Sequence, residues 1–317
     1  MARILFFSSI NGSSLSFYRP IVAKMGQNQS YWASIESDIE AHLKKVISIR
    51  APESVFEPMH YLTFTTPKST APALCVAACE LVGGDRAQAM AVASAMHLMH
   101  VATYTHQHMQ MARTEPGPVI EHEFGPNGVI VESQAKGLGP ARNLRDIEPE
   151  HKFGPNIELL TGDGIMPFAI ELIVKAMSPA RKNSDKIMRV ITEVTRAFGS
   201  QGLLEGQYRE IEWTQSGNEN EEMFEYVCKK KEGEIHACGA TCGAILGDGN
   251  DEEIERLKNY GLYVGIIQGI INGRNYNKKM EKRVNELRIL AMKEMDTSFK
   301  GKKLMKQIVS LVEESLS

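Results

Sequence analysis

The sequence predicts an all-α protein that folds as a single large helical bundle. Apolar residues recur at three- and four-residue intervals along most of the 317-residue chain, which is the spacing of one helix face. No stretch alternates between apolar and polar residues for long enough to predict a strand, and no linker divides the chain. A hydrophobic content of 43% is sufficient for a sizeable core.

Composition excludes several classes of function. The formal charge of −3 gives no support to binding of nucleic acid or of an anionic membrane surface. No apolar run approaches the ~20 residues that a membrane span needs. Five cysteines in a chain of this length do not make a disulfide framework, so a reducing compartment is expected.

The first 30 residues have the composition of a targeting segment. They contain three basic residues and six serines, and no acidic residue precedes Glu36. This composition favours an organellar transit peptide over a secretory signal, with a disordered N-terminus as the alternative. The folded domain is expected over residues 31–317.

The folded part begins with an amphipathic helix. Apolar residues at helical spacing run from about Tyr31 to Val46, and charged residues lie between them. Pro52 and Pro58 interrupt the pattern that follows.

Two further helices are defined by their end signals. Pro72 suits the first turn of a helix over residues 73–82, and Gly83 suits a left-handed stop after it. Asp85 can cap the next helix, which continues to about Gln110 without glycine or proline.

The segment 114–156 is expected to be a long loop, because it holds six prolines and many glycines. A near-repeat of six residues, 122–127 and 151–156, is interpreted as a local duplication that lengthened this loop. Helical patterns then return over residues 157–177, 185–198, 223–246, 251–271, 278–295 and 302–316.

Several stretches resemble the trans-prenyltransferases, above all the geranylgeranyl diphosphate synthases of plants. The matching motifs are residues 74–84, 160–171, 202–207 and 242–247, within a similarity over about residues 31–295. The resemblance implies the helical fold of the isoprenoid synthases. It also implies a cavity in which two Asp-rich motifs hold magnesium against an allylic diphosphate, because hard divalent cations on carboxylates offset the charge of the leaving group.

Every acid of these two motifs is replaced in this chain. The first motif falls on Gln107, His108 and Arg113, and the second on Asn272, Gly273 and Tyr276. Amides, an imidazole and a guanidinium do not substitute for paired carboxylates around Mg²⁺. The chain alone is therefore expected to hold no metal, to contain no catalytic residue and to leave a prenyl diphosphate intact.

Diphosphate anchoring is reduced as well. The family's basic Gly-Lys-Arg-x-Arg-Pro loop corresponds to residues 67–72, which keep Lys68 and lack both arginines. Lys231 stands where the family has a Lys-Thr pair, with Glu232 in place of the threonine. The resemblance implies at most weak residual diphosphate contacts at Lys68 and Lys231.

Two Cys-x-x-x-Cys motifs carry a closer resemblance. Cys75 and Cys79 lie four residues apart, as do Cys238 and Cys242, so each pair shares a helix face. Together with the lost Asp-rich motifs, they resemble the small subunits of plastid heteromeric geranyl diphosphate synthases. The resemblance implies that the four cysteines lie at or near the interface with a partner, although ordinary buried core cysteines would show the same spacing.

The function implied is that of a non-catalytic regulatory subunit. It would pair with a large subunit like geranylgeranyl diphosphate synthase, as a heterodimer or heterotetramer in the plastid, and shift the product toward geranyl diphosphate. Mg²⁺ would belong to the catalytic partner. The alternatives are a weakly active prenyltransferase with a rebuilt metal site, and a helical metal hydrolase that uses the histidines of one helix: His97, His100, His106 and His108.

Overall fold

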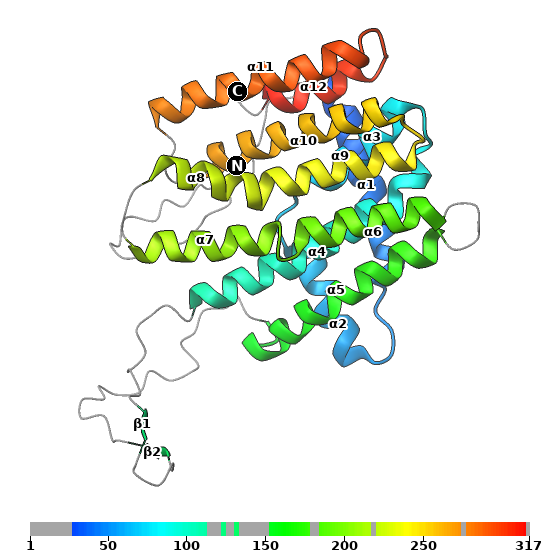
Figure 1. Ribbon diagram of the computed structural model, residues 1–317. Helices are drawn as coiled ribbons and strands as arrows, with labels where there is room; N and C mark the ends of the chain where they lie inside the picture. Colours follow the sequence, from blue (N-terminus) through cyan, green and yellow to red (C-terminus); the bar gives the residue numbers. More distant parts are fainter. Residues whose placement is uncertain are drawn as a thin grey trace, which may run out of the picture.

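The described part of the chain is a bundle of α-helices that run roughly along one direction (Figure 1). A computed structural model describes residues 27–112, 122–124, 130–132, 152–177, 184–216, 220–273 and 277–314. Its helices are α1 (Gln27–Val46), α2 (Glu53–Thr65), α3 (Ala71–Val82), α4 (Arg86–Ala112), α5 (Pro155–Met177), α6 (Ser184–Phe198), α7 (Leu203–Ser216), α8 (Glu221–Cys228), α9 (Glu234–Leu246), α10 (Asp251–Asn272), α11 (Lys278–Ser298) and α12 (Met305–Glu314). None of these helices is long and apolar enough to cross a bilayer.

The predicted end signals of α3 and α4 are confirmed. Gly83 has a φ of 112°, the left-handed conformation that glycine adopts without steric cost. Asp85 Oδ1 accepts a hydrogen bond from the backbone N–H of Ala87 at 2.8 Å. The side chain of Gln88 accepts a hydrogen bond from the N–H of Asp85 at 2.7 Å, so the start of α4 is capped by reciprocal side-chain to backbone hydrogen bonds.

Four predictions of local structure are wrong or incomplete. The first helix begins at Gln27, four residues before Tyr31. A helix, α2, forms around the buried Pro58, and another, α7, forms where the pattern predicts none. The predicted helix 223–246 is divided by a π-helical turn, η3 (Lys229–Gly233).

The expectation of no strand is also wrong in one place. Strands β1 (His122–Phe124) and β2 (Ile130–Glu132) pair antiparallel within the segment 114–156. Three residues on each side are too few for a period-two pattern to stand out in the sequence. The rest of the predicted loop lies outside the described residues up to Lys152, and α5 begins at Pro155, one residue before the loop was expected to end.

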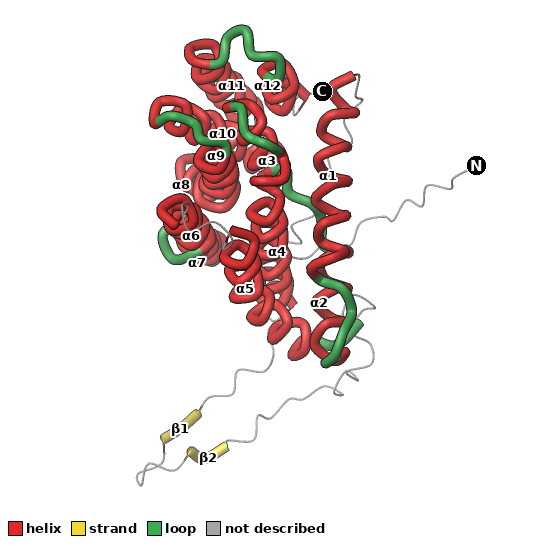
Figure 2. Tube along the Cα trace, turned by 90° about the vertical axis from the view of Figure 1, so that its right-hand side faces the viewer, coloured by secondary structure: helices red, strands yellow, loops and turns green. Residues whose placement is uncertain are grey.

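The centre of the bundle is formed by α3, α9 and α10, with α1 on one side and α5 to α7 on the opposite side (Figures 1 and 2). Helix α9 is buried from Ile235 to Leu246 and lies between the other two. A Cβ atom on Gly243 would lie 2.0 Å from the carbonyl oxygen of Cys75 in α3. A Cβ atom on Gly265 in α10 would lie 2.4 Å from the carbonyl oxygen of Glu232, on the turn that leads into α9. These helices therefore contact one another backbone to backbone, which only glycine permits.

Candidate functional site

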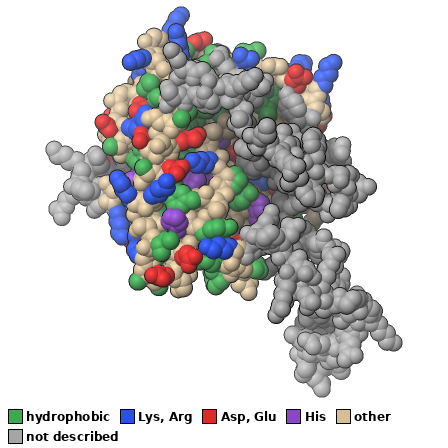
Figure 3. Space-filling model, turned by 180° about the vertical axis from the view of Figure 1, so that it is seen from behind, with side chains coloured by type: hydrophobic (Ala, Val, Ile, Leu, Met, Phe, Trp, Pro, Cys, Tyr) green, Lys and Arg blue, Asp and Glu red, His purple; other side chains and the backbone are tan. Residues whose placement is uncertain are grey.

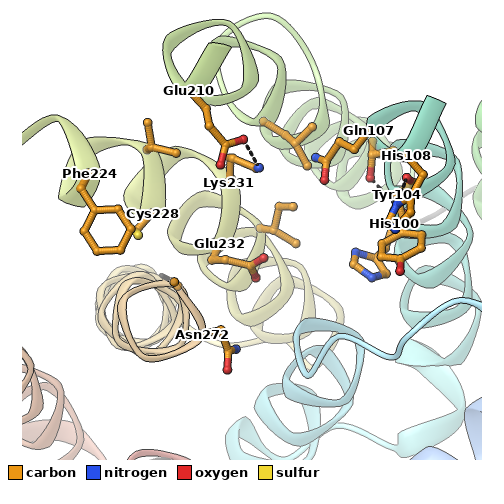
Figure 4. Close-up of a pocket in the computed structure, with 16 residues that line it drawn as sticks. His100, Tyr104, Gln107, His108, Glu210, Phe224, Cys228, Lys231, Glu232 and Asn272 are labelled. Atoms are coloured by element: carbon orange, nitrogen blue, oxygen red, sulfur yellow. Dashed lines mark hydrogen bonds and ion pairs between the residues drawn. The ribbon is translucent and has the colours of Figure 1, made fainter. Parts of the chain in front are cut away.

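A cavity of about 110 Å³ lies between α4 and α10, and we call it the vestigial cavity. Its other walls come from α7, α8, η3 and the start of α9 (Figure 4). Gln107 and His108 lie on its α4 side, and Asn272 and Gly273 lie on its α10 side. The structure thus brings the described positions of the two degenerate motifs to one cavity. Arg113 and Tyr276 lie outside the described residues.

The α4 wall is held by contacts within the protein. The imidazole of His108 stacks on the ring of Tyr104 with 4.0 Å between centroids, and its Nδ1 lies 3.1 Å from the carbonyl oxygen of Tyr104. His100 donates from Nε2 to the carbonyl of Pro67 at 3.0 Å. Burial lowers the pKa of His100 to about 4, so this side chain is neutral near pH 7.

The α10 wall has no room for a larger side chain as it stands. A Cβ atom on Gly273 would lie 2.4 Å from the ring of Phe224 in α8 (Figure 4 shows the ring). The aromatic ring therefore occupies the space into which an acidic side chain at position 273 would extend. The sequence did not indicate this contact, because Phe224 and Gly273 belong to separate helices.

The lysine that lines the cavity is neutralised by an ion pair. Lys231 Nζ lies 2.5 Å from Glu210 Oε2, which joins η3 to α7. Glu232 Oε2 lies 3.9 Å from Nδ1 of the fully buried His236. Lys231, for which a residual diphosphate contact was predicted, is thus already paired with Glu210 of α7. The sequence analysis did not single out Glu210.

The donor set does not fit Mg²⁺. The positions that would carry motif acids present an amide at Gln107, an imidazole at His108, an amide at Asn272 and no side chain at Gly273. The two carboxylates in the lining, Glu210 and Glu232, belong to the opposite wall and to the pairs just described. Among the described residues, no three His, Cys, Asp or Glu side chains are placed to hold a metal ion.

The four histidines of α4 contact different partners rather than one another. His97 donates from Nε2 to the carbonyl of Thr63 at 3.0 Å, and His100 donates to Pro67 as described. His106 Nε2 lies 3.1 Å from Asp163 Oδ1 on α5. The described part of the chain therefore offers the hydrolase alternative no convergent ligand set.

Comparison with known proteins identifies the fold family and a narrower group within it. The family model described as "Polyprenyl synthetase" matches residues 148–272. The chain is 45% identical over 292 residues to heterodimeric geranylgeranyl pyrophosphate synthase small subunit 2, chloroplastic, of Cannabis sativa, across 90% of this chain and 91% of that protein. This chain belongs to the small-subunit branch of the polyprenyl synthetase family.

Solved small-subunit structures share the fold. The geranyl diphosphate synthase small subunit from Antirrhinum majus is 48% identical, with a TM-score of 0.70 across 91% of this chain and all of that one. A chain of the mint heterotetrameric geranyl pyrophosphate synthase, in complex with ligands, is 46% identical with a TM-score of 0.71. The predicted all-α fold of the isoprenoid synthase type is confirmed.

The two cysteine motifs of this small subunit lie on helices that pack against each other. Cys75 and Cys79 are in α3, Cys238 and Cys242 are in α9, and none is more than 3% exposed. The Sγ atoms of Cys238 and Cys242 are 3.9 Å apart, and all four are free thiols. Burial raises the pKa of the Cys75 thiol well above its usual range. Direct contact of these side chains with a partner stays a prediction, and their burial in the chain leaves none of them on its surface.

Lys68 lies away from the vestigial cavity. Its Nζ lies 3.0 Å from Glu40 Oε2 on α1, and it lines a separate cavity between α1 and α2. The structure does not bring Lys68 and Lys231 together, so the weak diphosphate contact predicted for each stays a prediction.

Proposed function

We propose that this chain is a non-catalytic subunit of a heteromeric prenyl diphosphate synthase. It pairs with a large subunit like geranylgeranyl diphosphate synthase and shifts the product of that subunit toward the ten-carbon geranyl diphosphate. The observation that carries the proposal is the vestigial cavity, whose motif positions lack every carboxylate while the surrounding fold is retained. A cavity without cation ligands cannot offset the charge that a leaving diphosphate develops.

The names of the relatives support the pairing. The Cannabis sativa and Arabidopsis thaliana relatives are named small subunits of heterodimeric synthases, and a related Arabidopsis protein is named a large subunit. The similar mint structure is named heterotetrameric, so the proposed assembly is a heterodimer or a heterotetramer. We place Mg²⁺ in the large subunit.

An exposed apolar surface on α5, α6 and α7 is the part of the described chain best suited to the large subunit. In Figure 1, α6 and α7 lie end to end, and α5 runs beside α6. The large apolar side chains exposed on them are Ile157, Leu160, Val174, Met188, Leu204 and Tyr208. A large exposed apolar patch is typical of a protein interface, and we propose that these side chains contribute to one. Leu160 is the most exposed of the aliphatic ones on α5, at 64%.

Chloroplastic relatives support a plastid location, and the composition of residues 1–30 supports import. These residues lie outside the described part of the chain up to position 26, and α1 begins at Gln27. Cleavage is therefore expected before α1, which N-terminal sequencing of the plastid form would measure.

Coexpression with a plant geranylgeranyl diphosphate synthase tests the function. We expect the two chains to copurify and the complex to make a higher fraction of geranyl diphosphate than the large subunit alone. The purified small subunit should not consume isopentenyl and dimethylallyl diphosphates with Mg²⁺. Turnover by this chain above a control preparation, or an unchanged product ratio in the complex, would contradict the proposal.

A pair of variants locates the interface. Leu160→Arg on α5 should abolish copurification, because it places a charge in the apolar surface. Ile289→Arg on α11, where the side chain is 69% exposed, should leave copurification intact. Loss of copurification in both variants would show that folding, rather than the α5 surface, was disturbed; far-UV circular dichroism of each variant provides the check.

A further inference from the structure

A second and larger cavity lies beside α1, the helix on the side of the bundle opposite α6 and α7 (Figure 2). It has a volume of about 350 Å³ and lies between α1, α2, the start of α3 and α4, and we call it the α1 cavity. Its lining shares no residue with the vestigial cavity of about 110 Å³. Small-molecule sites in proteins occupy about 300–1,000 Å³, so only the α1 cavity of these two has the size of a ligand site.

The walls of the α1 cavity are largely apolar. Ile39 and Leu43 of α1 form one wall, and Phe64 of α2 forms another. Pro72 and Ala73 at the start of α3 complete the apolar lining. An apolar cavity of about 150 Å³ admits benzene in another protein, so a volume of about 350 Å³ has room for a ring with a short chain.

The charged groups of the lining carry no net charge. They are the carboxylates of Glu36 and Glu40 and the ammonium groups of Lys44 and Lys68. Both lysines are paired with Glu40, at 2.9 Å for Lys44 Nζ and 3.0 Å for Lys68 Nζ. Figure 3 shows the back face of the molecule, where side chains of both charge signs lie among apolar and histidine side chains. This balance favours a neutral ligand.

One buried imidazole that lines the cavity has an unused nitrogen. His97 of α4 is 5% exposed, and its Nε2 lies 3.0 Å from the carbonyl oxygen of Thr63. Because a carbonyl can only accept, Nε2 carries the hydrogen. Burial lowers the pKa of His97, so the imidazole is neutral near pH 7 and its Nδ1 is an acceptor. No described residue donates a hydrogen bond to this Nδ1.

A buried hydroxyl at the end of α2 is unused as well. Thr66 lines the same cavity and is 8% exposed. The hydroxyls of Thr63 and Thr65 donate to backbone carbonyl oxygens one turn earlier in α2. Within the described part of the chain, the hydroxyl of Thr66 makes no such bond, so it can donate to a ligand.

These two groups open into the α1 cavity at the same place. The fully enclosed polar atoms that lack a partner in the described chain lie on other residues. The unused groups of His97 and Thr66 therefore reach open space, and the α1 cavity is the space that both residues line. Thr63, which accepts from His97, lies three residues before Thr66, so both groups are at the C-terminal end of α2.

We propose that the α1 cavity binds a neutral alcohol with an apolar body, whose hydroxyl donates to Nδ1 of His97 and accepts from the hydroxyl of Thr66. A single hydroxyl oxygen can serve both contacts. The apolar body lies among Ile39, Leu43 and Phe64. A carboxylate is disfavoured because it has no proton for His97 and because the C-terminal end of α2 carries a partial negative charge.

Titration of the purified chain with 4-phenylbutanol tests the site, with its methyl ether as the matched probe. The ether keeps the apolar body and the acceptor oxygen but lacks the proton that His97 accepts. Methyl NMR signals of Ile39 and Leu43 report occupancy, and the ¹⁵N signal of His97 Nδ1 reports the hydrogen bond. We expect saturable methyl shifts, a ¹⁵N shift with the alcohol only, and affinity about tenfold weaker for the ether.

Two neighbouring threonines provide a matched pair of variants. Thr66→Val removes the unused hydroxyl at nearly constant volume and should weaken 4-phenylbutanol binding about tenfold. Thr65→Val makes the same change at an exposed residue that does not line the cavity, and it should leave the affinity unchanged. In the wild-type chain, 4-phenylbutyrate should bind more weakly than the alcohol, because it brings a negative charge and no proton.

Any one of these results would overturn the proposal: no saturable shift at Ile39 and Leu43, equal affinity for alcohol and ether, binding of 4-phenylbutyrate at least as tight as that of the alcohol, or equal losses in Thr65→Val and Thr66→Val. The first three comparisons use the wild-type chain, so they do not depend on the folding of a variant. The measurements use the isolated chain and no activity, so their result does not depend on the function proposed above.

Discussion

Replacing Gly243 by alanine should destabilise the chain by separating its two central helices. The new Cβ atom would lie 2.0 Å from the carbonyl oxygen of Cys75 and 2.9 Å from its carbonyl carbon. Both atoms belong to the backbone of α3, so no side-chain rotation can relieve the contact. An ordinary van der Waals contact starts at 3.4 Å, and α3 and α9 would have to move apart by about 1 Å.

The expected magnitude combines two opposing effects. Overpacking of a tight core costs about 3 kcal/mol at the upper end of its range, which applies here because the obstacle is backbone. Alanine gains about 1 kcal/mol over glycine in a helix interior. The net loss in the free energy of unfolding should therefore be about 2 kcal/mol.

Gly164→Ala provides the matched control. Gly164 is also inside a helix, α5, but a Cβ atom there would meet no atom within 4 Å. This variant should gain about 1 kcal/mol from helix propensity alone. Urea unfolding followed by far-UV circular dichroism measures both changes on the isolated chain. If Gly243→Ala were as stable as the wild type, or if both variants changed stability in the same direction, the close contact of α3 and α9 would be refuted.

Four further predictions concern ionisation and capping. Burial raises the pKa of Cys79 to about 12 and also raises the pKa values of Cys75 and Cys228, and all five cysteines are buried. Iodoacetamide at pH 8 should therefore modify almost none of the five in the native chain and all five in urea, counted by intact mass. Because thiols ionise in the unfolded chain first, the free energy of unfolding should also fall as the pH rises above about 9; a flat profile up to pH 11 would contradict this. The pKa of His100 is lowered to about 4, so the unfolded chain takes up a proton at this residue before the folded chain does. The free energy of unfolding should therefore fall by at most about 3 kcal/mol as the pH drops from about 6.5 toward 4. His100→Gln should flatten this slope in urea titrations at several pH values. Asn250 accepts from the N–H of Glu253 at 2.9 Å in a capping box at the start of α10, so Asn250→Ala should cost about 1 kcal/mol, and an unchanged urea midpoint would show the cap to be without effect.

Sequence predicted the elements whose ends are set by local chemistry. Gly83 and Asp85 fix the boundary between α3 and α4 through backbone conformation and a hydrogen bond two residues away, and both are readable in the chain. Sequence patterns did not predict the elements that depend on contacts between residues far apart in the chain. Pro58 removes one backbone hydrogen bond from α2, yet the helix persists because Met59 and Leu62 are buried against the core.

The site shows the same division. The absence of carboxylates at Gln107, His108 and Asn272 was visible from residue type, and the structure places these residues around one cavity. The ion pair of Lys231 with Glu210 joins residues 21 apart on different elements, and residue type alone does not indicate it. Nothing in local sequence could have predicted this pair.

The spacing of the cysteine motifs showed which residues share a helix face, but not whether that face is buried or on the surface. Four-residue spacing predicted one face for each pair, and the structure shows that those faces are buried inside the chain. A signal was present beside them: Gly239 and Gly243 in α9 and Gly247 directly after it repeat at the same interval, and each lies against a carbonyl oxygen of α3. Glycines at this interval mark close helix contact more directly than thiols do.

Main-chain atoms, not side chains, set the spacing of α3, α9 and α10. A scaffold whose central distances are fixed in this way keeps its shape without help from bound cations or substrate. The absence of acids at Gln107, His108 and Asn272 around the neighbouring cavity therefore leaves the outline of the molecule intact. That outline is what an associating protein would recognise.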